Sequence, residues 1–181
     1  MKKTLILSCC GPCSAGVVEF FAKTGRPACV LFYNPNIDSK EEHDLRSREN
    51  KRLCDFFNIP YISLAYEPQI WLEETKNFLS QPERSHRCSL CFTLRLKKAA
   101  EYAKENGFDC FTSVLGVSRY KNLEQVNTCA EEVSKLVGIP YDFTNWRKGG
   151  LEGRRAVLIK ELNLYSQKYC GCIASKKSYT I

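Results

Sequence analysis

The chain has 181 residues, of which 44% are hydrophobic, so it is long and apolar enough to form one domain around its own core. No apolar run approaches the roughly 18–20 residues of a membrane-spanning helix. The stretch Leu5–Leu7 is also too short for a secretory signal. We therefore expect a cytoplasmic protein. Its net charge of +7 favours a polyanionic partner such as RNA, although a basic protein without such a partner could have the same charge.

Segments typical of buried strands alternate with segments of helical periodicity along the whole chain. The strands are expected at residues 2–8, 28–33, 61–65, 111–115 and 141–143, and the helices at residues 15–23, 41–58, 68–79, 88–106, 123–137 and 151–164. Ser14 is the expected N-cap of the first helix, and Arg46, Arg48 and Arg52 are expected on a solvated helix face. The order predicts a three-layer α/β/α sandwich with a mostly parallel sheet, as one domain over residues 1–181.

Seven of the eleven cysteines fall into three tight groups. The groups are Cys9-Cys10-x-x-Cys13 after the first strand, Cys88-x-x-Cys91 at the start of a helix, and Cys170-Gly171-Cys172 near the C-terminus. In the cytoplasm thiols stay reduced, so this clustering indicates metal or redox chemistry rather than disulfides. Thiolates favour an iron–sulfur centre. The isolated cysteines are expected to be small buried hydrophobes: Cys29, Cys54, Cys110 and Cys129.

A [4Fe–4S] cluster takes four thiolates, and the three groups offer seven, which leaves room for a second metal or a redox pair. Because the side chains of Cys9 and Cys10 should diverge from one turn, we expect them to serve two centres. A structural zinc ion held by the second and third groups is an alternative, but it would leave the first group unexplained. A thioredoxin-like dithiol at Cys10 and Cys13 is a weaker one.

Polar and basic residues near the same sheet edge suit recognition of a nucleic acid, because ligands of such folds bind beyond the carboxyl ends of the strands. Tyr33, Asn34 and Asn36 follow the second strand and suit contacts to a heterocyclic base, although simple turn chemistry would also account for them. Lys121 and Arg147 are basic loop positions interleaved with aromatic residues, a mixture that favours unstacked RNA bases.

Several motifs occur in one order: Cys9-Cys10-Gly11-Pro12-Cys13, Tyr33-Asn34-Pro35-Asn36-Ile37, Arg87-Cys88-x-x-Cys91 with Arg95-Leu96, Phe111-Thr112-x-x-Leu115, Arg147-Lys148-Gly149 and Tyr165-x-Gln167-x-Tyr169-Cys170-Gly171-Cys172. Together they resemble the QueH-type, cobalamin-independent epoxyqueuosine reductases over nearly the whole chain. The resemblance implies an adenine-nucleotide α-hydrolase-like fold. It also implies the two-electron reduction of epoxyqueuosine to queuosine at the wobble position of tRNAs with a GUN anticodon.

The same resemblance implies a [4Fe–4S] cluster with an adjacent mononuclear iron. All seven clustered cysteines are expected metal ligands, with Cys10, Cys88, Cys91 and Cys172 on the cluster, Cys9 and Cys13 as catalytic residues, and Cys170 as a further ligand. We expect one of Cys9 and Cys10, with Cys13 or Cys170, to hold the second iron. Tyr33, Asn34, Asn36, Lys121 and Arg147 are the expected substrate-binding residues.

The expected electron donor is a ferredoxin or flavodoxin, because no glycine motif for a flavin or nicotinamide is visible. Two other functions remain open on the sequence. One is a zinc-stabilised, non-catalytic RNA-binding module. The other is a tRNA-thiolating enzyme of related fold, which would need ATP, but the turn after the first strand lacks a Ser-Gly-Gly type pyrophosphate loop.

Overall fold

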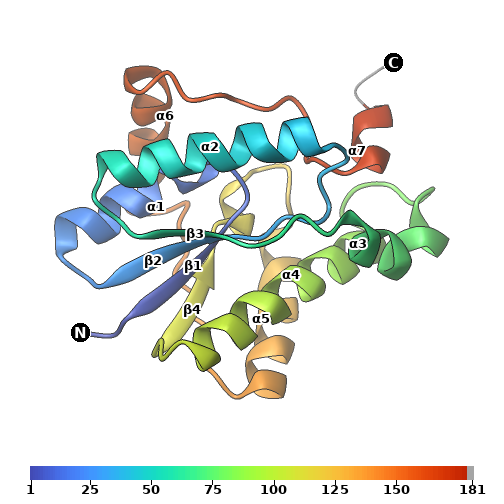
Figure 1. The fold of residues 1–181 in the computed structure, drawn as a ribbon, viewed down its shortest axis with the longest axis horizontal. Helices are drawn as coiled ribbons and strands as arrows, with labels where there is room; N and C mark the ends of the chain where they lie inside the picture. Colours follow the sequence, from blue (N-terminus) through green and yellow to red (C-terminus); the bar gives the residue numbers. More distant parts are fainter. Residues whose placement is uncertain (179–181) are drawn as a thin grey trace.

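A parallel sheet forms the centre of the protein in the computed structural model, which describes residues 1–178 (Figure 1). Its strands are β1 (Thr4–Ser8), β2 (Ala28–Phe32), β3 (Tyr61–Ser63) and β4 (Cys110–Ser113), in the order β3-β2-β1-β4. The three apolar residues of β1, Leu5, Ile6 and Leu7, are fully buried. A continuous apolar strand suits this position, because helices cover both faces of a parallel sheet.

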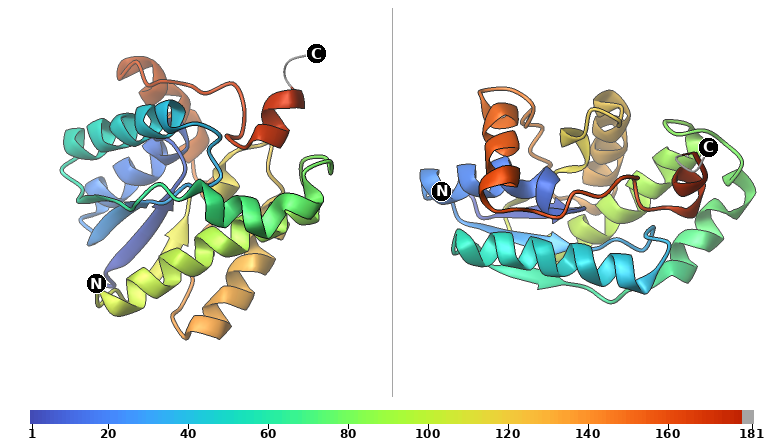
Figure 2. Two further views of the ribbon diagram at one scale, coloured as in Figure 1. Left: turned by 45° about the vertical axis from the view of Figure 1, so that its right-hand side comes forward. Right: turned by 90° about the horizontal axis from the view of Figure 1, so that it is seen from above.

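Helices form the two outer layers. They are α1 (Gly11–Thr24), α2 (Lys40–Phe56), α3 (Pro68–Thr75), α4 (His86–Glu105), α5 (Leu123–Val137), α6 (Leu151–Glu161) and α7 (Ile173–Ser178), with short 3-10 turns η1 (Lys76–Phe78) and η2 (Leu115–Val117). The helices α1, α2 and α6 cover one face of the sheet, and α4 and α5 cover the other (Figures 1 and 2). The predicted three-layer α/β sandwich is therefore confirmed. Within residues 1–178, every helix is too short or too polar to span a bilayer.

The start of the first helix differs from the prediction. Helix α1 begins at Gly11 with Cys10 as its N-cap, and not after Ser14. Pro12 lies within the first helical turn, because that turn leaves backbone N–H groups unpaired and needs none from proline. The Ser14 hydroxyl instead donates to the Cys10 carbonyl at 2.9 Å. Cys13 consequently lies in the first helical turn.

The predicted strand at residues 141–143 is wrong. Tyr141 forms a single isolated bridge with Phe111. Pro140 before it has no N–H to extend the pairing. The carboxylate of Asp142 then accepts hydrogen bonds from the backbone N–H and the hydroxyl of Thr144, at 3.0 and 2.6 Å, which turns the chain away from the sheet.

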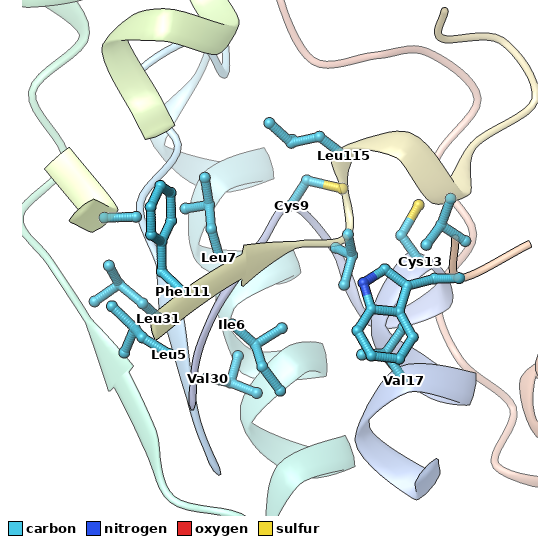
Figure 3. Close-up of a cluster of buried hydrophobic side chains, with 14 of the residues drawn as sticks. Leu5, Ile6, Leu7, Cys9, Cys13, Val17, Val30, Leu31, Phe111 and Leu115 are labelled. Atoms are coloured by element: carbon cyan, nitrogen blue, oxygen red, sulfur yellow. The ribbon is translucent and has the colours of Figure 1, made fainter. Parts of the chain in front are cut away.

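The hydrophobic core fills the space between the sheet and the helices and reaches the carboxyl ends of the strands, where Cys9 and Cys13 join it (Figure 3). The four isolated cysteines are buried, as predicted. On α2, Arg48 is exposed as expected, but the prediction for Arg46 is wrong. Its side chain is only 1% exposed, because the chain just before α7 lies against it.

Candidate metal centre

The three cysteine groups meet at the carboxyl edge of the sheet, around a cavity of about 430 Å³. Six of the seven clustered cysteines line it: Cys9, Cys13, Cys88, Cys91, Cys170 and Cys172. They come from the β1–α1 turn with the start of α1, the start of α4 and the segment before α7. This is the edge at which open α/β sheets bind their ligands.

The first group is a compact, buried triad. The sulfur atoms of Cys9, Cys10 and Cys13 all lie within 4.8 Å of one another. The expected divergence of Cys9 and Cys10 is wrong, because their sulfurs are 3.7 Å apart. The backbone is extended at Cys10 and helical from the next residue, so the chain turns back and brings the thiols together. Cys10 does not line the cavity, and its sulfur accepts a hydrogen bond from Nε2 of Gln167 at 2.8 Å.

The second group lies in the first turns of α4, which begins at His86, two residues before the predicted start. The sulfur of Cys88 accepts a hydrogen bond from the backbone N–H of Arg84 at 3.3 Å. Burial raises the pKa of the Cys91 thiol to about 11. The positive end of the helix dipole acts in the opposite direction and favours thiolates at this position.

The third group is a turn between the chain that follows α6 and the short helix α7. Gly171 has φ +127°, a conformation that side chains rarely adopt, and this lets the chain turn between Cys170 and Cys172. The sulfur of Cys172 accepts a hydrogen bond from the backbone N–H of Ser175 at 3.4 Å. Cys172 also packs with Cys91 in a small buried cluster, so the second and third groups are neighbours.

Electrostatics distinguish Cys9 from the other thiols of its triad. Hydrogen bonds from Cys10 and Cys13 stabilise its thiolate, and Lys121 adds positive charge, so the pKa of Cys9 is well below its usual value. Burial alone would lower the pKa of Lys121. The charge of the nearby cysteines, that of the Cys9 thiolate most of all, outweighs this effect and raises the pKa of Lys121. Lys121 therefore stays charged in the cavity, facing both the first and the third cysteine groups.

Two of the five predicted substrate-binding residues, Asn36 and Lys121, line the cavity. Tyr33 and Asn34 are buried and do not line it, and the side chain of Asn34 bonds to neighbouring groups instead. Nδ2 of Asn34 donates to the Ser8 carbonyl at 2.9 Å, and its side-chain oxygen accepts from Arg95. The structure thus places Tyr33 and Asn34 outside the cavity lining.

Arg147, the fifth predicted residue, lies outside the cavity lining and holds the loop that presents Lys121. Its guanidinium donates to the carbonyls of Gly116, Ser118 and Lys121 at 2.6, 2.6 and 2.9 Å. Five N–H donors in a rigid fork suit this role.

A second arginine holds the same loop. The guanidinium of Arg84 donates to the carbonyls of Tyr120 and Arg119 at 2.9 and 3.1 Å. The side chain of Tyr120 lines the cavity, yet the residue is 70% exposed. An exposed aromatic ring on a fixed loop therefore stands at the cavity rim.

Unpaired polar atoms also line the cavity, and some of them belong to residues that the sequence does not single out. Among residues 1–178, four buried side-chain oxygens in the cavity lining lack a hydrogen-bond partner, those of Asn36, Glu83, Gln125 and Gln167. Buried polar atoms in proteins are nearly always paired, so these acceptors indicate a ligand that brings hydrogen-bond donors. No local pattern marks Glu83 or Gln125, because only the fold brings them to the cavity.

The comparisons with known proteins identify the family. The family model described as epoxyqueuosine reductase QueH matches residues 4–178. The chain belongs to the QueH family of epoxyqueuosine reductases. The epoxyqueuosine reductase QueH of Histophilus somni (strain 129Pt) is 42% identical over 175 residues, which cover 96% of this chain and 72% of that protein. The QueH of Thermotoga maritima is 31% identical over 178 residues, or 97% of this chain and 91% of that protein.

QueH proteins are oxidoreductases, so this chain is an enzyme and the non-catalytic alternative no longer applies. Among solved structures, the U34-tRNA thiolase NcsA of Methanococcus maripaludis, determined with its [4Fe–4S] cluster, superposes with a TM-score of 0.55 at 14% identity. The match covers 96% of this chain and 61% of that protein. At this identity the likeness shows the fold alone, and it agrees with the α/β architecture described above.

Proposed function

We propose that this protein reduces the epoxide of epoxyqueuosine at the wobble position of tRNA and so forms queuosine, as one domain over residues 1–181. A [4Fe–4S] cluster and a second iron would occupy the thiol-lined cavity. One observation carries this proposal. Six of the seven clustered cysteines line a single cavity at the ligand-binding edge of the sheet, although they come from three distant segments of the chain.

The donor set fits these metals. Thiolates are the ligands of iron–sulfur clusters, and the cavity offers more of them than one cluster takes. Cys88, Cys91 and Cys172, with Cys10 or Cys170 as the fourth ligand, would hold the cluster. Cys9 and Cys13, whose sulfurs lie within 4.8 Å of each other, would hold the second iron.

Removal of the epoxide oxygen consumes two electrons and two protons and leaves an alkene and water. When bound, the metals supply the electrons and a Lewis-acidic site for the oxygen. The ammonium group of Lys121 stays charged in the cavity, where it would stabilise negative charge that develops on the oxygen as the C–O bond opens. The neighbouring Cys9 and Cys13 are buried, and the exclusion of water on that side strengthens this interaction.

The remaining groups suit the substrate. The unpaired oxygens of Asn36, Glu83, Gln125 and Gln167 would accept hydrogen bonds from hydroxyl and amine groups of the modified base. At the rim, Tyr120 offers a ring on which an unstacked base can lie, in a molecule with net charge +7. We propose tRNAs with a GUN anticodon as substrates and a ferredoxin or flavodoxin of the cytoplasm as the electron donor.

An anaerobic turnover assay tests the proposal. The reconstituted protein is incubated with a low-potential reductant and tRNA that contains epoxyqueuosine, and the nucleosides are analysed by mass spectrometry. We expect conversion to queuosine with the intact protein and with Cys129→Ala, which removes a buried thiol outside the three groups. Cys13→Ala should form no queuosine. Absence of conversion by the intact, metal-loaded protein would contradict the proposal.

A further inference from the structure

The chain between α6 and α7 brings the third cysteine group to the cavity. We call residues 164–172 the C-terminal strap. It runs alongside α2 and carries Gln167, Cys170 and Cys172 (Figures 1 and 2). The strap has no regular secondary structure of its own, so contacts with the rest of the protein must fix its course.

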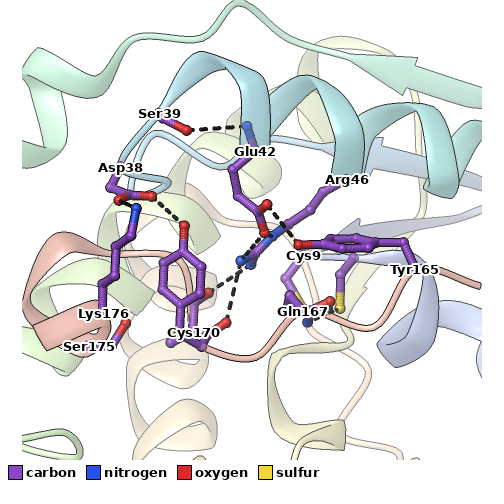
Figure 4. Close-up of polar contacts among 12 residues, drawn as sticks. Cys9, Asp38, Ser39, Glu42, Arg46, Tyr165, Gln167, Cys170, Ser175 and Lys176 are labelled. Carbon is purple, nitrogen blue, oxygen red and sulfur yellow. Dashed lines mark hydrogen bonds and ion pairs between the residues drawn. The ribbon is translucent and has the colours of Figure 1, made fainter. Parts of the chain in front are cut away.

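The buried Arg46 makes the central contact (Figure 4). Its guanidinium donates to the backbone carbonyl of Cys170, 124 positions later in the chain, at 2.9 Å, and to that of Tyr169 at 3.4 Å. Its Nε donates to Glu42 at 2.7 Å. The other carboxylate oxygen of Glu42 accepts from the hydroxyl of Tyr165 at 2.9 Å, so the Arg46–Glu42 pair contacts the strap at three residues.

The cysteine turn fits against the same guanidinium. A Cβ atom on Gly171 would lie only 3.1 Å from a guanidinium nitrogen of Arg46. The Gly171 carbonyl accepts from the backbone N–H of Asp38 at 2.9 Å, and the carboxylate of Asp38 accepts from the Tyr169 hydroxyl. The backbone of the turn is thus held on both sides of Gly171.

We propose that Arg46, supported by Glu42 and Asp38, is a positioning residue that holds the Cys170-Gly171-Cys172 turn ready for metal binding. The identity of the metal in this inference rests on the proposed function. The contacts of Arg46 with the strap do not depend on it. Arg46 also places positive charge near Cys10 and Cys9, and so partly offsets the negative charge of a thiolate cavity. Lysine cannot replace it, because only the planar fork reaches two carbonyls and a carboxylate together.

A comparison of Arg46→Lys with Arg48→Lys tests this role. Both variants keep the charge of α2, and Arg48 is exposed on the same helix. In the metal-free proteins, we expect backbone hydrogen exchange in residues 165–172 to be at least tenfold faster in Arg46→Lys, while Arg48→Lys matches the wild type. After anaerobic reconstitution, Arg46→Lys should hold less than half of the wild-type iron and sulfide, and the cluster that forms should give a changed electron paramagnetic resonance spectrum.

Wild-type iron, sulfide and spectrum in a folded Arg46→Lys variant would overturn the proposal. If that variant does not fold, Tyr169→Phe is used, which removes the hydroxyl bond to the Asp38 carboxylate and keeps the backbone bond between Asp38 and Gly171. It must show the same faster exchange and lower metal content, and unchanged values overturn the proposal. The exchange measurement needs no metal. Failure of the wild type to take up iron would therefore contradict the proposed function, while the comparison of the two metal-free variants still decides the role of Arg46.

Discussion

Gly171 separates two cysteines of the centre and has almost no free space around it. A methyl group there would lie 3.1 Å from Arg46, 3.2 Å from Ile37 and 3.3 Å from Asn36, on a backbone with φ +127°. Gly171→Ala must therefore displace the turn. We expect it to lower bound iron and sulfide together by at least half, measured after anaerobic reconstitution.

Gly153→Ala is the matched control for this variant. Gly153 is exposed in α6, and a Cβ atom there would meet nothing within 4 Å. Alanine in an exposed helix is favoured over glycine by about 1 kcal/mol, so stability should rise slightly and the metal content should not change. Equal metal content in the two variants would show that the turn tolerates a side chain.

Lys121 is the charged residue that we place closest to the chemistry. Lys121→Met keeps most of the side-chain volume and removes the ammonium group. Loss of one preorganised charge of this kind costs about 10²–10³ in kcat, whereas iron and sulfide should be retained, because the sulfurs are untouched. Lys168→Met removes an exposed lysine that also lines the cavity. This control should keep kcat within about threefold, and a similar kcat for both variants would contradict the role of Lys121.

At this scale the sequence predicts that the clustered thiols gather at one place, because close spacing of thiols is a local property, and their role as ligands stays a prediction. Six of the seven residues do line one cavity. The burial of Arg46 could not be predicted, because its partners Tyr169 and Cys170 lie more than a hundred positions away. The place of Glu83 and Gln125 in the cavity could not be predicted for the same reason. The sequence also does not show that Arg147 bonds to three backbone carbonyls.

Helices α1 and α6 are joined by a buried carboxylate. Glu19 on α1 is only 4% exposed and accepts from Nε of Arg154 on α6 at 2.8 and 2.9 Å, with Lys23 at 3.0 Å. Burial alone would raise the pKa of Glu19, but the hydrogen bonds from Arg154 and Lys23 hold it below its usual value. The charged form therefore stabilises the folded state at neutral pH.

Glu19→Gln should lower the melting temperature at pH 7 by about 2–4 °C, the effect of roughly 1 kcal/mol in a chain of this size. Since the folded-state pKa is depressed, the stabilisation is present above the ordinary carboxylate pKa and is lost as the pH falls through the folded value. The difference in melting temperature between the wild type and Glu19→Gln should thus become smaller in acid. Glu161 forms the other, more exposed ion pair of Arg154, so Glu161→Gln should lower the melting temperature less. A difference that becomes larger in acid would contradict this account.

The loop of residues 116–121 makes a separate prediction about RNA. Stacking of a base on an aromatic ring contributes about 1–3 kcal/mol, so Tyr120→Ala should weaken tRNA binding by roughly 5- to 150-fold. Tyr120→Phe keeps the ring and should bind like the wild type. Binding is measured by fluorescence anisotropy with labelled tRNA at one fixed salt concentration. Equal affinity of the two variants would exclude stacking at this position.

The elements themselves follow from the sequence, because hydrophobic periodicity is local. Helix α5 has the bounds predicted for it, and the four strands lie within one residue of a predicted segment or inside it. The failures occur where one residue decides between two local structures. Pro12 lies in the first turn of a helix that is expected only from residue 15, and Pro140 with Asp142 reduces a predicted strand to one bridge.

Across the whole molecule, the fold gathers chemistry at one edge of the sheet. The β1–α1 turn with the start of α1, the start of α4 and the C-terminal strap bring six thiols to one cavity, and the loop of residues 116–121 brings Lys121 and Tyr120 to the same place. A parallel sheet makes this possible, because all its strands end at one edge. The net charge of +7 suits the tRNA partner that we propose.

The iron and sulfide content of the anaerobically reconstituted protein tests the central claim most directly. A cubane with one further iron requires about five irons and about four sulfides per chain. Cys13→Ala should then lose about one iron and no sulfide, and Cys88→Ala should lose iron and sulfide together, while Cys129→Ala keeps both. Equal iron and sulfide, at about four each, in a fully active protein would contradict the second iron, and a colourless protein that holds only zinc would contradict the account as a whole.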